Sequence, residues 1–337
     1  MKKSALGIAV SSFVFVFATP GAHAESSAKV SARKHLHKSA SASHAAHGTH
    51  KTSSRRVAYT PSPAVNVNVG EIEGLGATPD PLSLKSNEAL VIDQATSQVL
   101  FEKNSTVPLP IASLTKLMTA LIVVEARQDM DEVLEVTTDD IDHIKNSSSR
   151  LRVGSRMTRT DMLHIALMSS ENRAASALGR NYPGGVQAFV AAMNAKAKEL
   201  GMFDTHYVEP TGLSSENVAS ARDLAKLVVA AYRHPLIREY STDSRYTVNP
   251  GGYKLQYISS NRLVLHSNWD IGLQKTGFIN EAGHCLVMQS KIQNRPVVMV
   301  FLDSRGKYSR FADANRVRDW MKVRKPELLT QATLPQG

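Results

Sequence analysis

The residues best suited to chemistry are Ser113 and Lys116, which stand three positions apart at the start of an apolar stretch. If that stretch is a helix, three residues advance about 4.5 Å and nearly complete one turn, so the hydroxyl and the amine share one face. A serine hydroxyl is a poor nucleophile at neutral pH and needs an adjacent base, which a neutral lysine can supply. The pair therefore predicts nucleophilic catalysis by Ser113 with Lys116 as its base.

The Ser-x-x-Lys spacing is not specific by itself. Three further copies occur, at Ser26/Lys29, Ser31/Lys34 and Ser304/Lys307. Those copies lie in a polar N-terminal segment or a polar turn, whereas the copy at Ser113 is followed by residues that are apolar on most sides of a helix, as expected for a buried central helix. A serine at the start of a helix also suits a capping role, so the spacing leaves that alternative open.

Two other motifs follow in the chain. Ser170-Glu171-Asn172 comes after a predicted helix, and Lys275-Thr276-Gly277 lies in a predicted strand. In this order the trio resembles the S-x-x-K, S-D-N and K-T-G motifs of penicillin-binding proteins and class A β-lactamases, with Glu171 in place of the aspartate. Ser-x-Asn recurs at Ser215 and Ser259, but Ser170 has the long helical stretch before it that the family arrangement requires, and Ser215 remains the alternative.

The resemblance extends from about residue 85 to 325. Glu209-Pro210-Thr211-Gly212-Leu213 contains the Pro-Thr-Gly-Leu loop of low-molecular-mass penicillin-binding proteins, and Ser169 to Ala175 and Tyr182 to Gly185 resemble D-alanyl-D-alanine endopeptidases of the penicillin-binding protein 7 type. The likeness implies a serine D,D-peptidase that hydrolyses D-alanyl-diaminopimelate cross-links of peptidoglycan through an acyl-enzyme. It also implies covalent inhibition by β-lactams and no metal or other cofactor.

The resemblance further implies a role for each motif residue. The backbone N–H groups of Ser113 and Phe278 would bind the oxyanion. Ser170 would pass a proton to the leaving amine, and the charge of Lys275 would help burial to keep Lys116 neutral. Asn172 and Thr276 would position the peptide, and Gly277 would leave the strand edge open to it.

The first 24 residues predict export. Lys2 and Lys3 precede an apolar run from Ala5 to Thr19, and Ala22-His23-Ala24 closes it, a pattern typical of a signal peptide cut after Ala24. A membrane anchor is disfavoured because the run is shorter than the roughly 20 apolar residues that span a bilayer. The predicted location is periplasmic.

Residues 25–81 predict a disordered basic tether, rich in Ser, Ala, His and Lys. Its histidines are irregularly spaced, which favours a solvated linker over a metal site: His35, His37, His44, His47 and His50. A peptidase domain at 82–325 and a tail at 326–337 follow. The net charge of +10 could attract nucleic acid, but export favours acidic polymers of the cell envelope. The one cysteine, Cys285, lies in an apolar string and suits a buried small residue.

The pattern of elements predicts an α/β (α+β) fold of the β-lactamase/transpeptidase type. A β-hairpin is expected at 89–101, helices at 161–167, 186–200 and 221–232 within a mainly helical middle from about 129 to 240, and strands at 272–278, 284–290 and 296–302. A closing helix is expected at 309–323, with an apolar stripe on one side. The stripe could make at most peripheral contact with a membrane, but a helix that covers one face of the sheet is favoured. An antiparallel sheet built from both chain ends, with an inserted helical lobe, places the cleft where the two meet.

Three other functions fit parts of the sequence. A D-alanyl-D-alanine carboxypeptidase shares every motif, although only about 60 residues follow Lys275-Thr276-Gly277, which favours an endopeptidase without a further β-domain. A class A β-lactamase uses a glutamate to activate the deacylating water, and Glu209 is the one candidate at a suggestive place between the second and third motifs. A non-catalytic peptidoglycan-binding protein fits the basic charge but not the intact motifs.

Overall fold

The computed structural model describes residues 68–323. The predicted signal peptide, the histidines of the tether and the tail from residue 326 lie outside the described residues. Within the described part, no helix combines the length and the apolar character that crossing a membrane requires.

A five-stranded antiparallel sheet joins the two ends of the described chain. Its strands are, in spatial order, β2 (Val99–Lys103), β1 (Ser86–Asp93), β11 (Arg295–Ser304), β10 (Gly283–Ile292) and β9 (Asp270–Ile279). The central pair, β1 and β11, comes from opposite ends of the sequence, with Leu90 opposite Val300. The predicted fold class, hairpin and C-terminal strands are therefore confirmed, with each strand a few residues longer than expected.

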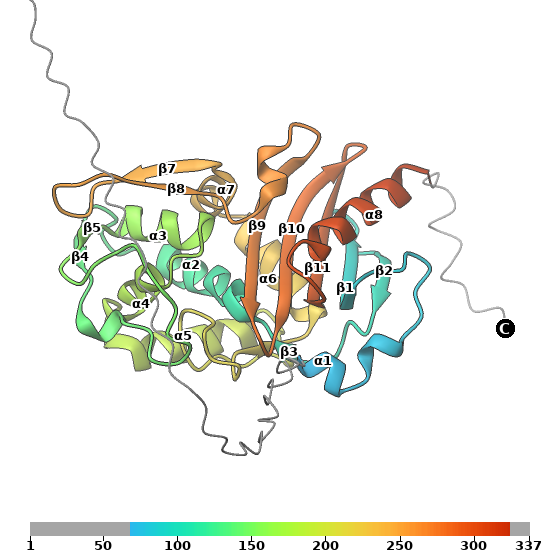
Figure 1. Cartoon of the computed structure of the whole chain (residues 1–337), viewed down its shortest axis with the longest axis horizontal. Helices are drawn as coiled ribbons and strands as arrows, with labels where there is room; N and C mark the ends of the chain where they lie inside the picture. Colours follow the sequence, from blue (N-terminus) through green and yellow to red (C-terminus); the bar gives the residue numbers. More distant parts are fainter. Residues whose placement is uncertain (1–67, 324–337) are drawn as a thin grey trace, which may run out of the picture. The chain divides into compact units, whose positions relative to one another are not determined.

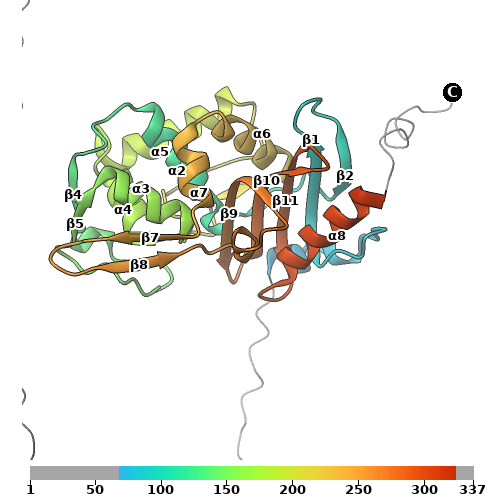
Figure 2. The ribbon, with the colours of Figure 1, turned by 90° about the horizontal axis from the view of Figure 1, so that it is seen from above.

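Both faces of the sheet are covered, because alternate residues of each strand point to opposite sides. Leu90 and Val300 face the core that contains α6 (Ala221–Tyr232), whereas Val91 and Met299 face α8 (Ser309–Val323). Figure 2 shows the two helices on opposite sides of the strands. The apolar stripe of α8 thus packs on the sheet, as the favoured prediction had it, and Trp320 lies edge-on to the ring of Phe101.

The remaining helices form a helical lobe between β2 and β9 in the sequence (Figure 1). They are α2 (Thr115–Glu125), α3 (Arg159–Met168), α4 (Asn172–Arg180), α5 (Gly185–Glu199) and α7 (Pro235–Thr242). Helix α2 is buried from Thr115 to Val123, as its apolar sequence predicts, and contacts α3, α4, α5 and α6. The lobe is thus organised around the helix that follows the candidate nucleophile.

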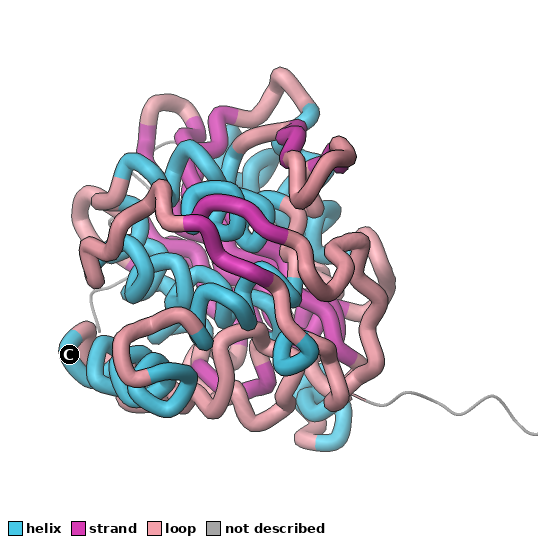
Figure 3. Tube along the Cα trace, turned by 90° about the vertical axis from the view of Figure 1, so that its left-hand side faces the viewer, coloured by secondary structure: helices cyan, strands magenta, loops and turns pink. Residues whose placement is uncertain are grey.

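The middle of the chain is less helical than the sequence predicts. Short strands interrupt it: β4 (Val133–Glu135) pairs with β5 (Arg156–Thr158), and β6 (Val218–Ala219) pairs with β3 (Leu109–Pro110), which precedes the middle region. A further pair, β7 (Arg245–Val248) with β8 (Leu255–Ile258), follows this region. Seen from the lobe side, helix and loop make up most of the chain nearest the viewer, with strands among them (Figure 3). Strands of two to four residues are too short to show a period of two.

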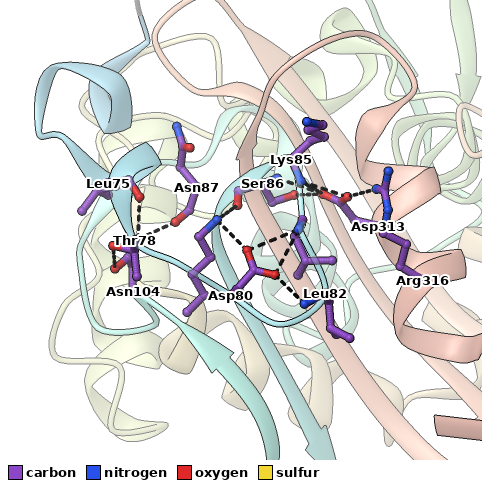
Figure 4. Close-up of polar contacts among 12 residues, drawn as sticks. Leu75, Thr78, Asp80, Leu82, Lys85, Ser86, Asn87, Asn104, Asp313 and Arg316 are labelled. Atoms are coloured by element: carbon purple, nitrogen blue, oxygen red, sulfur yellow. Dashed lines mark hydrogen bonds and ion pairs between the residues drawn. The ribbon is translucent and has the colours of Figure 1, made fainter. Parts of the chain in front are cut away.

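The predicted disordered tether ran to residue 81. The structure instead folds residues 68–81 against the sheet, so the predicted boundary is corrected there. This stretch contains α1 (Val69–Ile72) and also Asp80, which Figure 4 shows beside Leu82. The Asp80 carboxylate forms a 3.0 Å ion pair with Lys103 of β2. Both side chains are 5% exposed. Asp80 also accepts hydrogen bonds from the N–H groups of Leu82 and Leu84. These contacts are long-range or depend on turns, which composition does not reveal.

Candidate active site

The candidate nucleophile lies at the entry to α2. Ser113 is the middle residue of a 3-10 turn (Ala112–Leu114) that leads into the helix, and Lys116 is the second residue of α2. The Lys116 Nζ atom lies 2.9 Å from the Ser113 Oγ. No side chain caps either helix start, so the alternative of Ser113 as a cap is not what the structure shows. The predicted hydroxyl and amine are adjacent.

Lys116 is fully enclosed by neutral partners. Its Nζ donates to the Oδ1 of Asn172 at 2.7 Å and to the carbonyl oxygen of Thr211 at 2.6 Å. Burial lowers the pKa of Lys116 to about 8, and the carboxylates of Glu209 and Glu171 raise it only in part. A substantial fraction of this amine is neutral near pH 8, so it can accept a proton from the serine hydroxyl.

The second motif brings its serine into the cleft through a left-handed backbone. Ser170 has a φ of 67°, a conformation that is uncommon for residues other than glycine. The next residue, Glu171, is buried and holds the turn, because its carboxylate accepts hydrogen bonds from the Ser149 hydroxyl at 2.7 Å and from the Tyr257 hydroxyl at 3.3 Å. The glutamate in place of aspartate thus connects the turn to a loop and to β8.

The third motif lies on β9, the edge strand nearest α2. A side chain at Gly277 would place its Cβ 3.0 Å from the Ile111 carbonyl oxygen and 3.2 Å from the Ser113 nitrogen. Glycine therefore allows the strand to approach the backbone of the nucleophile. Lys275 is completely buried, and its Nζ donates to the carbonyl oxygen of Thr276 at 2.9 Å. Burial and the charges of Lys116 and Arg310 lower the pKa of Lys275 well below its ordinary value.

A cleft of about 470 Å³ collects most of the predicted residues. Six of the eight line it: Ser113, Ser170, Asn172, Thr276, Gly277 and Phe278. Lys116 and Lys275 lie buried behind these residues instead of on the wall. Ser215 does not line the cleft, and its neighbour Asn217 is buried in hydrogen bonds with Glu209 and Thr115. The choice of Ser170 over Ser215 agrees with this arrangement.

Several residues of the site were not assigned by sequence reasoning. Ser147 accepts a hydrogen bond from the Nδ2 of Asn172 at 3.0 Å, and the hydroxyls of Ser260 and Thr276 lie 2.7 Å apart. Arg310 of α8 lines the cleft although it is only 8% exposed, and within residues 68–323 its Nε has no hydrogen-bond partner. None of these residues stands in a motif, and only the fold brings them to the cleft.

The loop that contains Thr211 is held against the nucleophile turn. Gly212 has a φ of 81°, and a Cβ there would lie 1.9 Å from the Ala112 carbonyl oxygen. The carboxylate of Glu209 is occupied within the loop, since it accepts hydrogen bonds from the N–H of Thr211 at 2.6 Å and from the Nδ2 of Asn217 at 3.0 Å. Glu209 therefore serves to shape the loop, and it is not among the residues that line the cleft.

The lone cysteine takes no part in this site. Cys285 is buried, opposite Gly277 in the sheet, and burial raises the pKa of its thiol to about 12. A thiol with so high a pKa is a poor nucleophile at neutral pH. The prediction of a small buried residue at this position is confirmed.

Comparison with known proteins agrees with the geometry. The sequence model of peptidase family S11, described as D-alanyl-D-alanine carboxypeptidase, matches residues 76–306. A D-alanyl-D-alanine endopeptidase of Pseudomonas aeruginosa is 52% identical over 71% of this chain and 78% of its own length. One from Escherichia coli is 48% identical over 72% and 79%.

A solved structure is similar as well. A penicillin-binding protein of Listeria monocytogenes, crystallised in a cefotaxime-bound form, is 30% identical. It superimposes with a TM-score of 0.64 over 72% of this chain and 98% of its own. A bound cefotaxime in that protein indicates that this fold accommodates a β-lactam.

Proposed function

The chain belongs to peptidase family S11, the D-alanyl-D-alanine carboxypeptidases, and we propose that it is a serine D,D-endopeptidase that hydrolyses D-alanyl-diaminopimelate cross-links of peptidoglycan. The observation that carries the proposal is the 2.9 Å contact between Ser113 Oγ and a buried amine that has only neutral hydrogen-bond partners. The names of the two endopeptidases compared above favour cleavage of a cross-link over removal of a terminal D-alanine.

In the first step, the Nζ of neutral Lys116 takes the proton of Ser113 while the serine oxygen attacks the D-alanine carbonyl carbon. The carbonyl oxygen becomes an oxyanion, for which the N–H groups of Ser113 and Phe278 are the proposed donors. The close approach of β9 at Gly277 supports this role, because it brings the strand and the nucleophile turn together.

The tetrahedral intermediate collapses as the bond between carbonyl carbon and nitrogen breaks. The leaving amine needs a proton, which we assign to the hydroxyl of Ser170 on the cleft wall, with the proton on Lys116 replacing it. Asn172 keeps Lys116 in place, and burial together with the charge of Lys116 lowers the pKa of Lys275. Water then hydrolyses the acyl-enzyme and regenerates the serine.

Two features suit the cleft to an acidic peptide. Arg310 places a positive charge on a largely desolvated wall of the cleft. Its attraction for a carboxylate of the substrate is stronger there than in bulk water. The hydroxyl of Thr276, paired with that of Ser260, is a further donor to the same region. We also propose that the chain is exported to the periplasm by the predicted signal peptide, and that β-lactams acylate Ser113 as they mimic the D-alanyl peptide.

The test combines a labelled penicillin with purified muropeptides. We expect a long-lived adduct on Ser113 and, by mass spectrometry, conversion of cross-linked dimers to monomers, both absent from Ser113→Ala. Loss of only a terminal D-alanine from monomers would assign a carboxypeptidase. Rapid penicillin turnover would assign a β-lactamase, and unchanged cross-links with no adduct would leave a binding protein.

A further inference from the structure

An ion pair lies at the edge of the cleft, between the helical lobe and the sheet. Lys145 lies in the loop between β4 and β5, and Glu281 lies in the turn between β9 and β10. The Lys145 Nζ is 2.5 Å from a Glu281 carboxylate oxygen, and the two side chains are 29% and 37% exposed. Lys145 lines the same cleft as Ser113. The hydrogen bond from Lys145 lowers the pKa of Glu281, which favours the carboxylate form of that residue.

The backbone of each partner is fixed with respect to the candidate nucleophile. The carboxylate of Asp142 accepts hydrogen bonds from the N–H groups of Lys145 and Ser147 at 2.9 and 2.7 Å. Ser147 in turn contacts Asn172, the partner of Lys116. On the other side, the carbonyl oxygen of Glu281 accepts from the N–H of Val69 at 3.0 Å. The backbone of both charged residues is thus held in place. Ion pairs as exposed as this one add little to folding stability.

The direction of the substrate follows from the sheet. A peptide whose D-alanine carbonyl bonds to the Phe278 N–H can extend β9 as an antiparallel strand, with the D-alanine N–H returning to the Phe278 carbonyl. In that orientation the leaving amine lies beside Gly277, and the residue preceding D-alanine runs past Ile279 toward Glu281. The ion pair therefore lies next to the diamino acid of the acyl-side stem peptide.

We propose that Lys145 and Glu281 recognise the free side-chain end of that diamino acid. This inference rests on the proposed function and names the chemistry that the acyl side of the cleft selects. The free end of a diaminopimelate residue carries both an ammonium and a carboxylate. The ammonium pairs with Glu281 and the carboxylate with Lys145, so one ion pair is exchanged for two. An L-lysine residue of the substrate in the same position has no carboxylate at its side-chain end, so it offers Lys145 no partner.

The experiment uses the full chain and two synthetic cross-linked peptides that differ only in the acyl-side residue, diaminopimelate or L-lysine. Wild-type protein is expected to favour the diaminopimelate peptide by roughly tenfold in kcat/KM, mainly through KM. Lys145→Met and Glu281→Gln should each bring this ratio close to one. The matched control is Lys226→Met, which removes a lysine paired with Asp223 on α6, outside the cleft, and should retain the ratio.

The outcomes separate the two proposals. Equal kcat/KM for both peptides in wild type overturns the inference and leaves the proposed function in place. An equal loss on both peptides in Lys145→Met and Glu281→Gln also overturns it, since the pair would then be only a structural contact. If wild type cleaves neither peptide, the proposed function fails, and the inference fails with it.

Discussion

Lys116 and Lys103 are both buried lysines, and their surroundings are opposite. Lys103 pairs with the carboxylate of Asp80 at 3.0 Å and donates to the carbonyl oxygen of Ser86. Among residues 68–323, Lys116 is bonded only to a hydroxyl and to amide oxygens. Burial alone would raise the pKa of Asp80, but its hydrogen bonds from the Leu84 N–H and Lys103 lower it below its ordinary value.

The comparison shows how one residue type serves two purposes. A carboxylate favours the ammonium form, so the Lys103 region is an ion pair that joins the N-terminal segment to the sheet. Neutral hydrogen-bond partners compensate the lost hydration of a buried ammonium less completely than a carboxylate does. The amine of Lys116 therefore loses its proton more easily, and its pKa falls to about 8. Three variants or measurements test this distinction.

The largest effect is expected for Lys116→Met. Removal of the base should slow acylation of Ser113 by labelled penicillin by about 10²- to 10⁴-fold, the range typical of a general base. The rate is measured by quenched-flow with fluorescent penicillin, and circular dichroism checks the fold. Acylation at the wild-type rate would show that Lys116 is structural in the same sense as Lys103.

Lys103→Met should change stability and not chemistry. Breaking a buried ion pair leaves Asp80 uncompensated, so the free energy of unfolding in urea should fall by about 3–5 kcal/mol. The double variant Lys103→Met/Asp80→Asn should recover much of this loss, and the folded fraction should be acylated at the wild-type rate. A specific loss of acylation in Lys103→Met would contradict the distinction.

The smallest effect is expected in the pH dependence. Because the base form of Lys116 is the neutral one, acylation should rise roughly tenfold per pH unit below about 8 and level off above it. Asn172→Asp places a carboxylate beside Nζ, raises the Lys116 pKa by about 1–3 units and moves the rising limb to higher pH. At pH 7 the rate should fall about tenfold or more. Identical profiles for the two proteins would rule out Lys116 as the titrating base.

Much of the fold was predictable because it depends on local patterns. The closing helix has the predicted bounds, 309–323, since its apolar residues follow a helical period, and the hairpin at 89–101 is marked by a polar turn between apolar runs. The short strand pairs outside the main sheet and the folding of 68–81 were not predictable. Both depend on contacts with distant segments, such as Asp80 with Lys103.

For the site, the amino-acid sequence alone specifies which groups are available and places Ser113 and Lys116 about one turn apart. The protonation of the amine depends on the folded environment. The partners of Lys116 come from 56 and 95 residues away, at Asn172 and Thr211, and burial with neutral dipoles, not proximity in sequence, lowers its pKa. The ion pair of Lys145 with Glu281, 136 residues apart, was likewise a product of the fold.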